Sequence, residues 1–230
     1  MIKILGIIPA RGGSKGIPGK NVKHLAGRPL LAYTFESAVN SKLLPKVILS
    51  SDSEEIINVA KDLGIEVPFK RPSDLALDET PAIDVVRHAV EHFLAQGEEF
   101  DAVCLLQPTS PIRGKDLIDS AIDKFISGDF DSVISVRTVP DEFNPHWCFE
   151  EEDGKLKIAT GEKKIIPRRQ ELPKTFYRDG AVYIVKVEVL MEQNSLYGEK
   201  IGSIVSSGPH INLDVPSDWE EAEILLKNYS

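Results

Sequence analysis

The apolar positions of the chain follow two spacings in turn, one typical of strands and one typical of helices. Short apolar runs predict buried strands at residues 2–9, 46–51, 64–69, 101–107, 131–136, 180–187, 201–207 and 211–216. Between them, apolar residues recur every three or four positions, which predicts helices at residues 29–41, 51–64, 80–97, 115–128 and from 217 on. This alternation predicts an α/β fold with a mostly parallel sheet covered on both faces.

Polar residues near the starts of three predicted helices have the spacing of caps. Ser51 and Glu54 form a candidate capping box, in which each side chain accepts a backbone N–H of the other residue. Thr80 is the candidate N-cap of the third helix, with Pro81 in its first turn. Ser217 and Glu220 form a second candidate box before the last helix.

The alternation fails between residues 138 and 178, a segment rich in proline, charged and aromatic residues. About forty irregular residues are too many for a plain connection in a compact domain, so the segment is predicted to be an insertion. Residues 148–158 predict a hairpin, with Asp153 and Gly154 at its turn. We therefore expect one domain over residues 1–230 with an inserted arm at 138–178, of the kind that often serves a partner subunit.

Charge excludes some classes of partner. The chain has 27 Lys and Arg against 36 Asp and Glu, a formal net charge of −9, which argues against binding of nucleic acid or an anionic membrane by bulk electrostatics. Any bound anion must then be held by a local cationic site. The early apolar run at residues 4–10 is far short of the roughly 20 residues that span a bilayer, so a cytoplasmic protein is expected.

Cysteine and histidine carry no recognisable chemistry in this sequence. Cys104 and Cys148 fit neither a disulfide framework nor a zinc spacing, and both are expected to be small buried hydrophobes. The five histidines are scattered, and none forms a convincing nucleophilic triad with a serine or cysteine; they are His24, His88, His92, His146 and His210.

A glycine-rich loop follows the first predicted strand and reads IPARGGSKGIPGKN at residues 8–21. Its glycines let backbone N–H groups approach an anion, and the carboxyl ends of parallel strands are where such sheets bind ligands. Arg11, Lys15 and Lys20 supply three cations that would repel one another without an anion between them. The loop has neither the Walker A nor the G-x-G-x-x-G spacing. Phosphate is the expected ligand, and a solvated glycine-rich turn is the alternative.

The pattern A-R-x-x-S-K-G-x-P-x-K-N in this loop resembles the sugar-activating cytidylyltransferases, in particular the CMP-sialic acid synthetases (acylneuraminate cytidylyltransferases). Further stretches match in order over nearly the whole chain: SSDSEEI, KRPSDLALDETP, LLQPTSPIR, PRRQELPKTFYRDGAVYI and INLDVPSDWEEAE. The resemblance implies a Rossmann-like three-layer nucleotidyltransferase fold. It also implies a homodimer in which the inserted arm makes the subunit contact.

The resemblance implies a CTP site in the glycine-rich loop and one residue beyond it. Residues around the triphosphate and ribose would be Arg11, Gly12, Ser14, Lys15, Lys20 and Asn21. Among these, Lys20 would stabilise charge on the reacting phosphates. Arg71 matches a residue near the base, where a donor to the cytosine O2, together with nearby backbone acceptors for the cytosine amino group, would separate CTP from UTP. The alternative for Arg71 is a surface ion pair with Asp74 or Asp78.

The resemblance also implies a site for an acidic sugar. Gln107 would hydrogen-bond the sugar, with Thr109, Ser110 and Arg113 extending a polar floor; the alternative for Gln107 is a structural bond to neighbouring backbone. The adjacent basic residues of the inserted arm, Arg168 and Arg169, match residues that approach the sugar carboxylate, and which of the two does so stays open.

The metal site departs from the family pattern. The family often has D-x-D late in the chain, whereas this sequence has Asn212-Leu213-Asp214. Asp214 is the expected principal ligand of Mg²⁺, with phosphate oxygens and water completing the shell, and Asn212 offers only a neutral oxygen. The alternative for Asp214 is a turn or N-cap residue before Pro216. Whether one or two metals act is left open.

The reaction implied is nucleotidyl transfer, in which the anomeric hydroxyl of a 2-keto sugar acid attacks the α-phosphate of CTP and pyrophosphate leaves. Arg11, Lys20 and Asp214 are the expected catalytic residues, and the proton acceptor is left open. The motifs favour nine-carbon acids such as N-acetylneuraminate, legionaminate or pseudaminate. The alternatives are an enzyme for the eight-carbon acid Kdo or another sugar acid, and a catalytically silent nucleotide-binding regulator.

Overall fold

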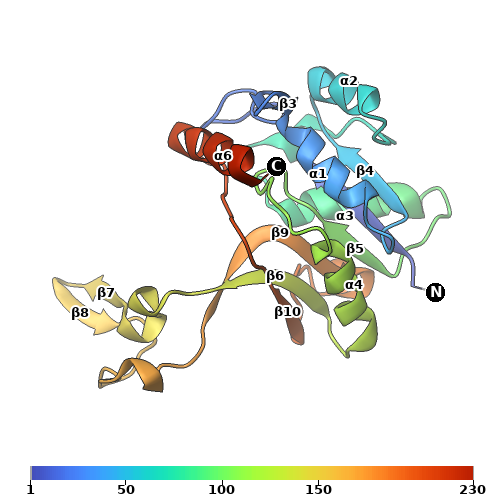
Figure 1. Cartoon of the computed structure of the whole chain (residues 1–230). Coiled ribbons are helices and arrows are strands. Elements are labelled where there is room, and N and C mark those ends of the chain that lie inside the picture. Colours follow the sequence, from blue (N-terminus) through green and yellow to red (C-terminus); the bar gives the residue numbers. More distant parts are fainter. Residues whose placement is uncertain (1, 230) are drawn as a thin grey trace. The chain divides into compact units, whose positions relative to one another are not determined.

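The computed structural model describes residues 2–229 and has a central sheet of six strands (Figure 1). Their order across the sheet is β10-β6-β9-β5-β1-β4. The strands are β1 (Ile4–Pro9), β4 (Lys46–Ser50), β5 (Ala102–Leu105), β6 (Ser132–Thr138), β9 (Phe176–Lys186) and β10 (Ile201–Val205). β1 pairs in parallel with both β4 and β5, and β9 is antiparallel to β5. The predicted α/β fold with a mostly parallel sheet is confirmed.

Helices cover both faces of this sheet. They are α1 (Leu30–Val39), α2 (Glu54–Asp62), α3 (Ala82–Leu94), α4 (Leu117–Ser127), α5 (Val187–Glu192) and α6 (Pro216–Tyr229). Successive residues of a strand point to opposite faces, so Ile4 and Ile8 pack with α1, α2 and α4 whereas Leu5 and Ile7 pack with α3 and α5. Because helices cover both faces of β1, its sequence is a continuous apolar run.

Short elements complete the chain. Three-residue or four-residue 3₁₀ turns are η1 (Ser73–Ala76), η2 (Asp141–Phe143), η3 (Pro145–Trp147) and η4 (Arg169–Glu171). Two small hairpins are formed by β2 (His24–Leu25) with β3 (Arg28–Pro29) and by β7 (Phe149–Glu152) with β8 (Lys155–Ile158). The hairpin of β2 and β3 and the helix α5 had no counterpart in the sequence prediction, because both are too short to show a period.

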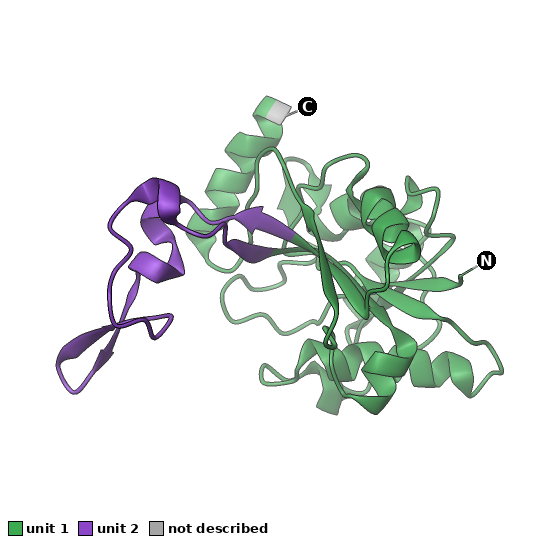
Figure 2. Cartoon of the chain, turned by 90° about the horizontal axis from the view of Figure 1, so that it is seen from below, with its two compact units in different colours: residues 1–135, 179–230 green, residues 136–178 purple. Residues whose placement is uncertain are grey.

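The contacts of the chain divide it into two compact units, residues 1–135 with 179–230 and residues 136–178 (Figure 2). The second unit corresponds closely to the predicted insertion. Inside it, Asn144 is buried, and its side-chain amide donates to the Pro173 carbonyl at 2.9 Å. The predicted hairpin is present as β7 and β8, and its turn residues Asp153 and Gly154 both have positive φ, as a two-residue type I′ turn requires.

The predicted caps are wrong at each of the three helices. Ser53, not Ser51, caps α2 by accepting the Ile56 N–H at 3.5 Å, because the helix begins only at Glu54. At α3 the N-cap position is Pro81 and has no side-chain bond, and the Thr80 hydroxyl instead donates to the Asp74 carbonyl.

The last helix also begins differently from its prediction. α6 starts at Pro216, and the Asp218 carboxylate accepts the N–H groups of Asp214 and Val215 at 2.7 and 2.8 Å. The bond to Val215 is one half of a capping box shifted from the predicted Ser217 and Glu220.

Two predicted strands are also wrong. Residues 64–69 form a single bridge, Ile48 to Glu66, and Pro68 has no N–H with which to extend the pairing. Residues 211–216 are not paired in a sheet; one backbone bond, from Leu213 N to Thr109 O at 2.9 Å, ties them to the rest.

The cysteine and membrane expectations can be compared with the structure. Cys104 is fully buried in the core, as predicted, and burial raises the pKa of its thiol to about 12, so it stays protonated at neutral pH. Cys148 is partly exposed. Over residues 2–229, no helix combines the length and apolar character needed to cross a bilayer.

Candidate active site

A cleft of about 250 Å³ opens where β1 and β5 end. Three segments line it: the glycine-rich loop after β1, residues 71–85 around η1 and the start of α3, and residues 107–109 after β5. The carboxyl edge of a parallel sheet is where its loops converge, so residues from distant parts of the sequence meet here. The predicted site residues in this cleft are Arg11, Ser14, Lys20, Asn21, Arg71, Gln107 and Thr109.

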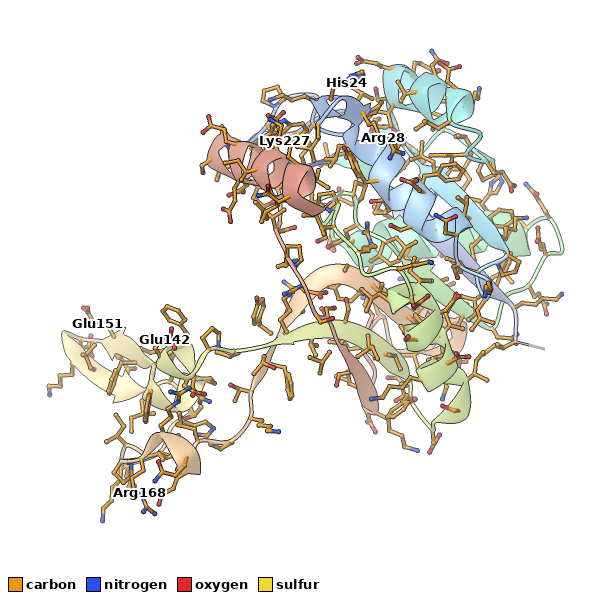
Figure 3. The ribbon with its side chains drawn as sticks, viewed as in Figure 1. His24, Arg28, Glu142, Glu151, Arg168 and Lys227 are labelled. Atoms are coloured by element: carbon orange, nitrogen blue, oxygen red, sulfur yellow. The ribbon has the colours of Figure 1, made fainter. Side chains whose placement is uncertain are left out.

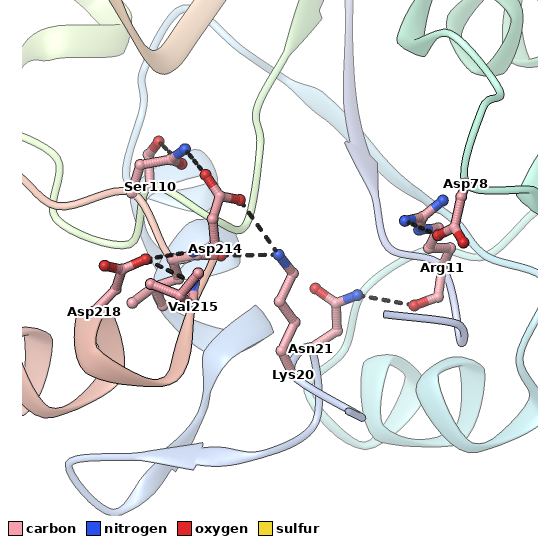
Figure 4. A network of polar contacts seen from close by, with 10 residues as sticks. Arg11, Lys20, Asn21, Asp78, Ser110, Asp214, Val215 and Asp218 are labelled. Atoms are coloured by element: carbon pink, nitrogen blue, oxygen red, sulfur yellow. Dashed lines mark hydrogen bonds and ion pairs between the residues drawn. The ribbon is translucent and has the colours of Figure 1, made fainter. Parts of the chain in front are cut away.

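The glycine-rich loop is fixed by bonds to its neighbours. The buried Asn21 donates its side-chain amide to the Arg11 carbonyl at 3.0 Å, which closes the loop on itself (Figure 4). The Gly12 N–H donates to a carboxylate oxygen of Asp52, also at 3.0 Å. Ile17 is buried and anchors the middle of the loop in an apolar cluster with Leu213 and Trp219. The loop therefore has a defined shape before any ligand binds.

Lys20 lies between this loop and the segment before α6. Its ammonium donates to the Leu213 carbonyl at 2.8 Å and lies 3.9 Å from the Asp214 carboxylate (Figure 4). The Lys20 side chain is 16% exposed, and burial lowers its pKa, a shift that the Asp214 charge opposes. A partly buried, oriented ammonium is suited to stabilise charge on a phosphate.

Arg11 and Lys15 share one carboxylate. Asp78 lies 2.6 Å from the Arg11 guanidinium through one oxygen and 2.7 Å from the Lys15 ammonium through the other. Arg11 also donates to the Leu77 carbonyl at 2.7 Å. The hydrogen bond from Lys15, with the charges of both cations, lowers the pKa of Asp78.

Arg71 is a buried cation at the wall of the cleft, only 4% exposed. The surface ion pair considered as an alternative, with Asp74 or Asp78, is wrong: its carboxylate neighbour is Asp52 at 3.6 Å. Its buried Nε and Nη2 have no hydrogen-bond partner within the described part of the chain. Burial lowers the pKa of Arg71, as expected for a desolvated charge.

Of the motif after β5, only part faces the cleft. Gln107 and Thr109 line it. Ser110 is fully buried, and its hydroxyl donates to the Asp179 carbonyl at 3.1 Å. Arg113 is also buried and donates to backbone carbonyls and to Thr34, so it does not extend a polar floor.

The exposed residues Asn212 and Asp214 alternate with the buried residues Ile211 and Leu213. The extended alternation therefore persists without a paired strand, and the Asn212 amide donates to the Asp214 carboxylate at 2.7 Å (Figure 4). No group of three or more His, Cys, Asp and Glu suited to a metal is found among residues 2–229. The Asp214 carboxylate, beside the Lys20 that lines the cleft, could hold a Mg²⁺ ion that takes most of its ligands from substrate and water.

Gly16 is the point where the glycine-rich loop touches this segment. A Cβ atom at Gly16 would lie 1.9 Å from the Asp214 carbonyl oxygen, so only glycine fits without a backbone shift. We expect Gly16→Ala to lower the free energy of unfolding by about 1–3 kcal/mol, because one of two backbone segments must move. Urea unfolding measures the change. Gly13→Ala in the same loop is the control, because its Cβ would meet nothing within 4 Å; equal losses in both variants would contradict the contact.

Arg168 and Arg169 belong to the second unit, and each forms an ion pair inside that unit; Figure 3 labels Arg168. Arg168 pairs with Glu171 and Arg169 pairs with Asp141.

Two carboxylates of the site were missed as site residues from the sequence. Asp52 follows β4, the strand beside β1, and bonds the glycine-rich loop. Asp78 appeared only as a possible partner of Arg71, whereas it pairs with Arg11 and Lys15. Its position could have identified Asp52 in the sequence, because it lies just beyond the carboxyl end of β4, the strand beside β1, and the glycine-rich loop follows β1.

Comparison with known proteins decides the family. The protein-family model described as cytidylyltransferase matches residues 5–198. The chain belongs to the cytidylyltransferase family. The enzyme class predicted from the motifs, a nucleotidyltransferase, is confirmed, and so is the resemblance on which that prediction depended.

Individual members of the cytidylyltransferase family align with almost the full chain. A pseudaminic acid cytidylyltransferase of Campylobacter jejuni is 34% identical over 227 residues, covering 98% of this chain and 97% of the relative. A CMP-N,N'-diacetyllegionaminic acid synthase of Legionella pneumophila is 35% identical over 230 residues, with the same coverage. A solved CMP:2-keto-3-deoxy-manno-octonic acid synthetase complexed with CTP has a TM-score of 0.74 at 16% identity, covering 99% of this chain and 100% of its own, and supports the fold.

Proposed function

We propose that this cytidylyltransferase joins CTP to a nine-carbon 2-keto sugar acid and releases pyrophosphate. The observation that carries the proposal is the composition of the cleft: a glycine-rich loop with oriented cations faces a buried guanidinium whose Nε and Nη2 make no hydrogen bond. The sugar class is supported by relatives named for pseudaminic and diacetyllegionaminic acids, which align with 98% of the chain.

The base would bind at Arg71. A buried donor without a hydrogen bond is costly. The Nε and Nη2 groups make none, although Asp52 lies 3.6 Å from Nη2, and this indicates that a ligand supplies an acceptor. The cytosine O2 is such an acceptor. The triphosphate would then extend to Arg11, Lys15 and Lys20 of the glycine-rich loop.

In the reaction, a bond forms between the anomeric oxygen of the sugar acid and the α-phosphorus, and the bond from the α-phosphorus to the bridging oxygen of pyrophosphate breaks. The hydroxyl proton passes to solvent water during the attack. Lys20 and Arg11 stabilise charge on the phosphates, since both are oriented before the substrate arrives.

Asp214 would hold a Mg²⁺ ion, with Asn212 offering a neutral oxygen beside it. When bound, the ion would neutralise negative charge on the phosphates of CTP. Asp214 is suited to this role because its side chain is 66% exposed and lies near the ammonium of Lys20.

The acidic sugar would lie near Gln107 and Thr109, which reach the cleft from the β5 side, with Ser110 supporting this loop from within. Arg168 or Arg169 would contact its carboxylate. The homodimer with residues 138–178 at its contact, and the cytoplasmic location, stay predictions.

Pyrophosphate release tests the proposed function. The protein would be incubated with CTP and Mg²⁺ and, in turn, N-acetylneuraminate, N,N'-diacetyllegionaminate, pseudaminate and the eight-carbon acid Kdo. We expect release with at least one nine-carbon acid, and little or none when UTP replaces CTP. Release with Kdo alone would overturn the sugar class. CTP binding without release across the panel would favour a silent regulator.

Arg71→Met tests base recognition. We expect kcat/KM for CTP to fall about 10- to 100-fold, because a charged donor to a buried acceptor typically contributes about 1.5–3 kcal/mol. Uracil carries the same O2, so the change tests contact with the base and not the choice between CTP and UTP. Steady-state pyrophosphate release with CTP measures the effect. An Arg71→Met enzyme with unchanged kcat/KM for CTP would contradict the assignment of Arg71 to the base.

A further inference from the structure

Asp78 forms ion pairs with two of the three cations of the glycine-rich loop, Arg11 and Lys15. Its two carboxylate oxygens are divided between them, one with the Arg11 guanidinium at 2.6 Å and the other with the Lys15 ammonium at 2.7 Å (Figure 4 shows the Arg11 side). A bridging pair of oxygens is also what a phosphate group presents to two cations. The Asp78 carboxylate is therefore an anionic group of the protein itself, at the place where the proposed triphosphate needs to bind.

The ion pairs that Asp78 forms with Arg11 and Lys15 are accessible to solvent. The Arg11 and Asp78 side chains are 32% and 33% exposed and the Lys15 side chain is 82% exposed, so a soluble anion can reach them. Exposed ion pairs of this kind stabilise a fold little, about 0.2–1 kcal/mol each, and exchange with competing anions at small cost. A purely structural role would therefore contribute little to stability.

The segment that carries Asp78 is not anchored by burial. η1 has no buried residue, and Leu77, which lines the cleft, is 50% exposed. Local bonds shape the segment, such as Thr80 N to Leu77 O at 3.3 Å, while Arg11 itself donates to the Leu77 carbonyl. If Arg11 turns to a phosphate, the segment loses both of its contacts with that residue and can shift as a unit.

We propose that Asp78 occupies the phosphate subsite when no nucleotide is bound, and that the triphosphate must displace it. This inference rests on the proposed function of the same loop. Asp78 then determines affinity, because every ligand whose phosphates reach Arg11 and Lys15 must displace it and binds more weakly as a result. Cytidine has no phosphate, so Asp78 does not affect its binding. The tightest ligands are those with enough charge to outcompete the carboxylate.

The test is equilibrium binding by calorimetry without sugar acid, using CTP with Mg²⁺, cytidine, and inorganic tripolyphosphate as probes. We expect Asp78→Asn to bind CTP and tripolyphosphate about 3- to 10-fold more tightly than the wild type, from the value of exposed ion pairs. Cytidine affinity should not change. Asp78→Ala should behave like Asp78→Asn, and it removes any remaining acceptor at this position.

Asp74→Asn is the matched control. Asp74 lies in the same segment and has the same charge, but it bonds Thr80 through its backbone carbonyl, which accepts the Thr80 hydroxyl and is kept in the variant. An equal gain in Asp74→Asn would show a general charge effect and would overturn the proposal. So would unchanged or weaker binding of tripolyphosphate by both Asp78 variants, or a wild type that binds no tripolyphosphate at all. Tighter binding by the Asp78 variants supports the proposal even if no sugar acid yields pyrophosphate, which would refute the proposed reaction alone.

Discussion

Replacing Lys20 with methionine is expected to lower kcat about 10²- to 10³-fold, the usual loss when one preorganised charge-stabilising donor is removed. The Lys20 ammonium is oriented by the Leu213 carbonyl at 2.8 Å and lies 3.9 Å from Asp214, so it faces the proposed phosphates without reorganisation. Pyrophosphate release at saturating CTP and sugar acid measures the change. Circular dichroism and urea unfolding establish that the variant folds.

Lys23→Met is the control for Lys20→Met, because Lys23 is a neighbour in sequence whose ammonium lies over the Trp219 ring at 4.5 Å. Its kcat should stay within about twofold of the wild type, as expected for a surface change away from the reacting groups.

Lys20→Arg adds a pH test. Burial lowers the pKa of Lys20, so the activity of the wild type should fall at an alkaline pH at which an ordinary lysine is still protonated. The Lys20→Arg enzyme should show no such alkaline decrease, because arginine stays protonated. A Lys20→Met enzyme with normal kcat would contradict the proposed role.

The fold could be predicted where the pattern is long and local. β1 and α3 show their apolar period over enough residues to distinguish strand from helix. The caps could not be placed, because candidate residues such as Ser51 and Ser53 lie two positions apart and the first turn of α2 decides between them. Residues 211–216 have a strand pattern, yet whether a strand forms depends on a neighbour to pair with, which the pattern does not show.

The site could be predicted where it is contiguous. Arg11, Lys20 and Asn21 come from one loop, and their types and position after β1 already indicate an anion site. The partners that define their geometry come from far away: Leu213 for Lys20 and Asp78 for Arg11. Long-range pairs of this kind depend on the folded arrangement of loops, so sequence spacing contains little information about them.

Arg113 shows how a motif can identify a residue and misplace its side chain. It lies six residues after Gln107, in a stretch that resembles a sugar-binding motif, but its guanidinium turns into the protein. Its donors bond three separate segments, namely the Gln107 carbonyl after β5, the Ala181 carbonyl in β9 at 3.0 Å, and the Thr34 hydroxyl in α1 at 2.8 Å. Burial lowers the pKa of Arg113 to about 10, so it remains charged at neutral pH.

We expect Arg113→Met to lower the free energy of unfolding by about 3–5 kcal/mol. The change removes donors from the buried Ala181 carbonyl and Thr34 hydroxyl, at about 1–3 kcal/mol each, and from the Gln107 carbonyl, which keeps the Ser110 N–H. This loss is partly offset because a charge no longer has to be desolvated. Urea unfolding at neutral pH measures it. Because the Gln107 carbonyl is one of the released groups, KM for the sugar acid should rise more than KM for CTP in any Arg113→Met protein that folds.

Arg28→Met separates this effect from the loss of any arginine. Arg28 is about half exposed, pairs with Glu36 at 2.8 Å and lies over the Tyr33 ring, so its removal should cost less than about 1 kcal/mol. Arg113→Lys keeps the charge but cannot present three donors in a planar fork, so its loss of stability should fall between the two. Similar losses in Arg113→Met and Arg28→Met would mean that the buried acceptors find other donors. In that case the loop that carries Gln107 would be positioned by the backbone bond from Leu213 to Thr109 and not by Arg113.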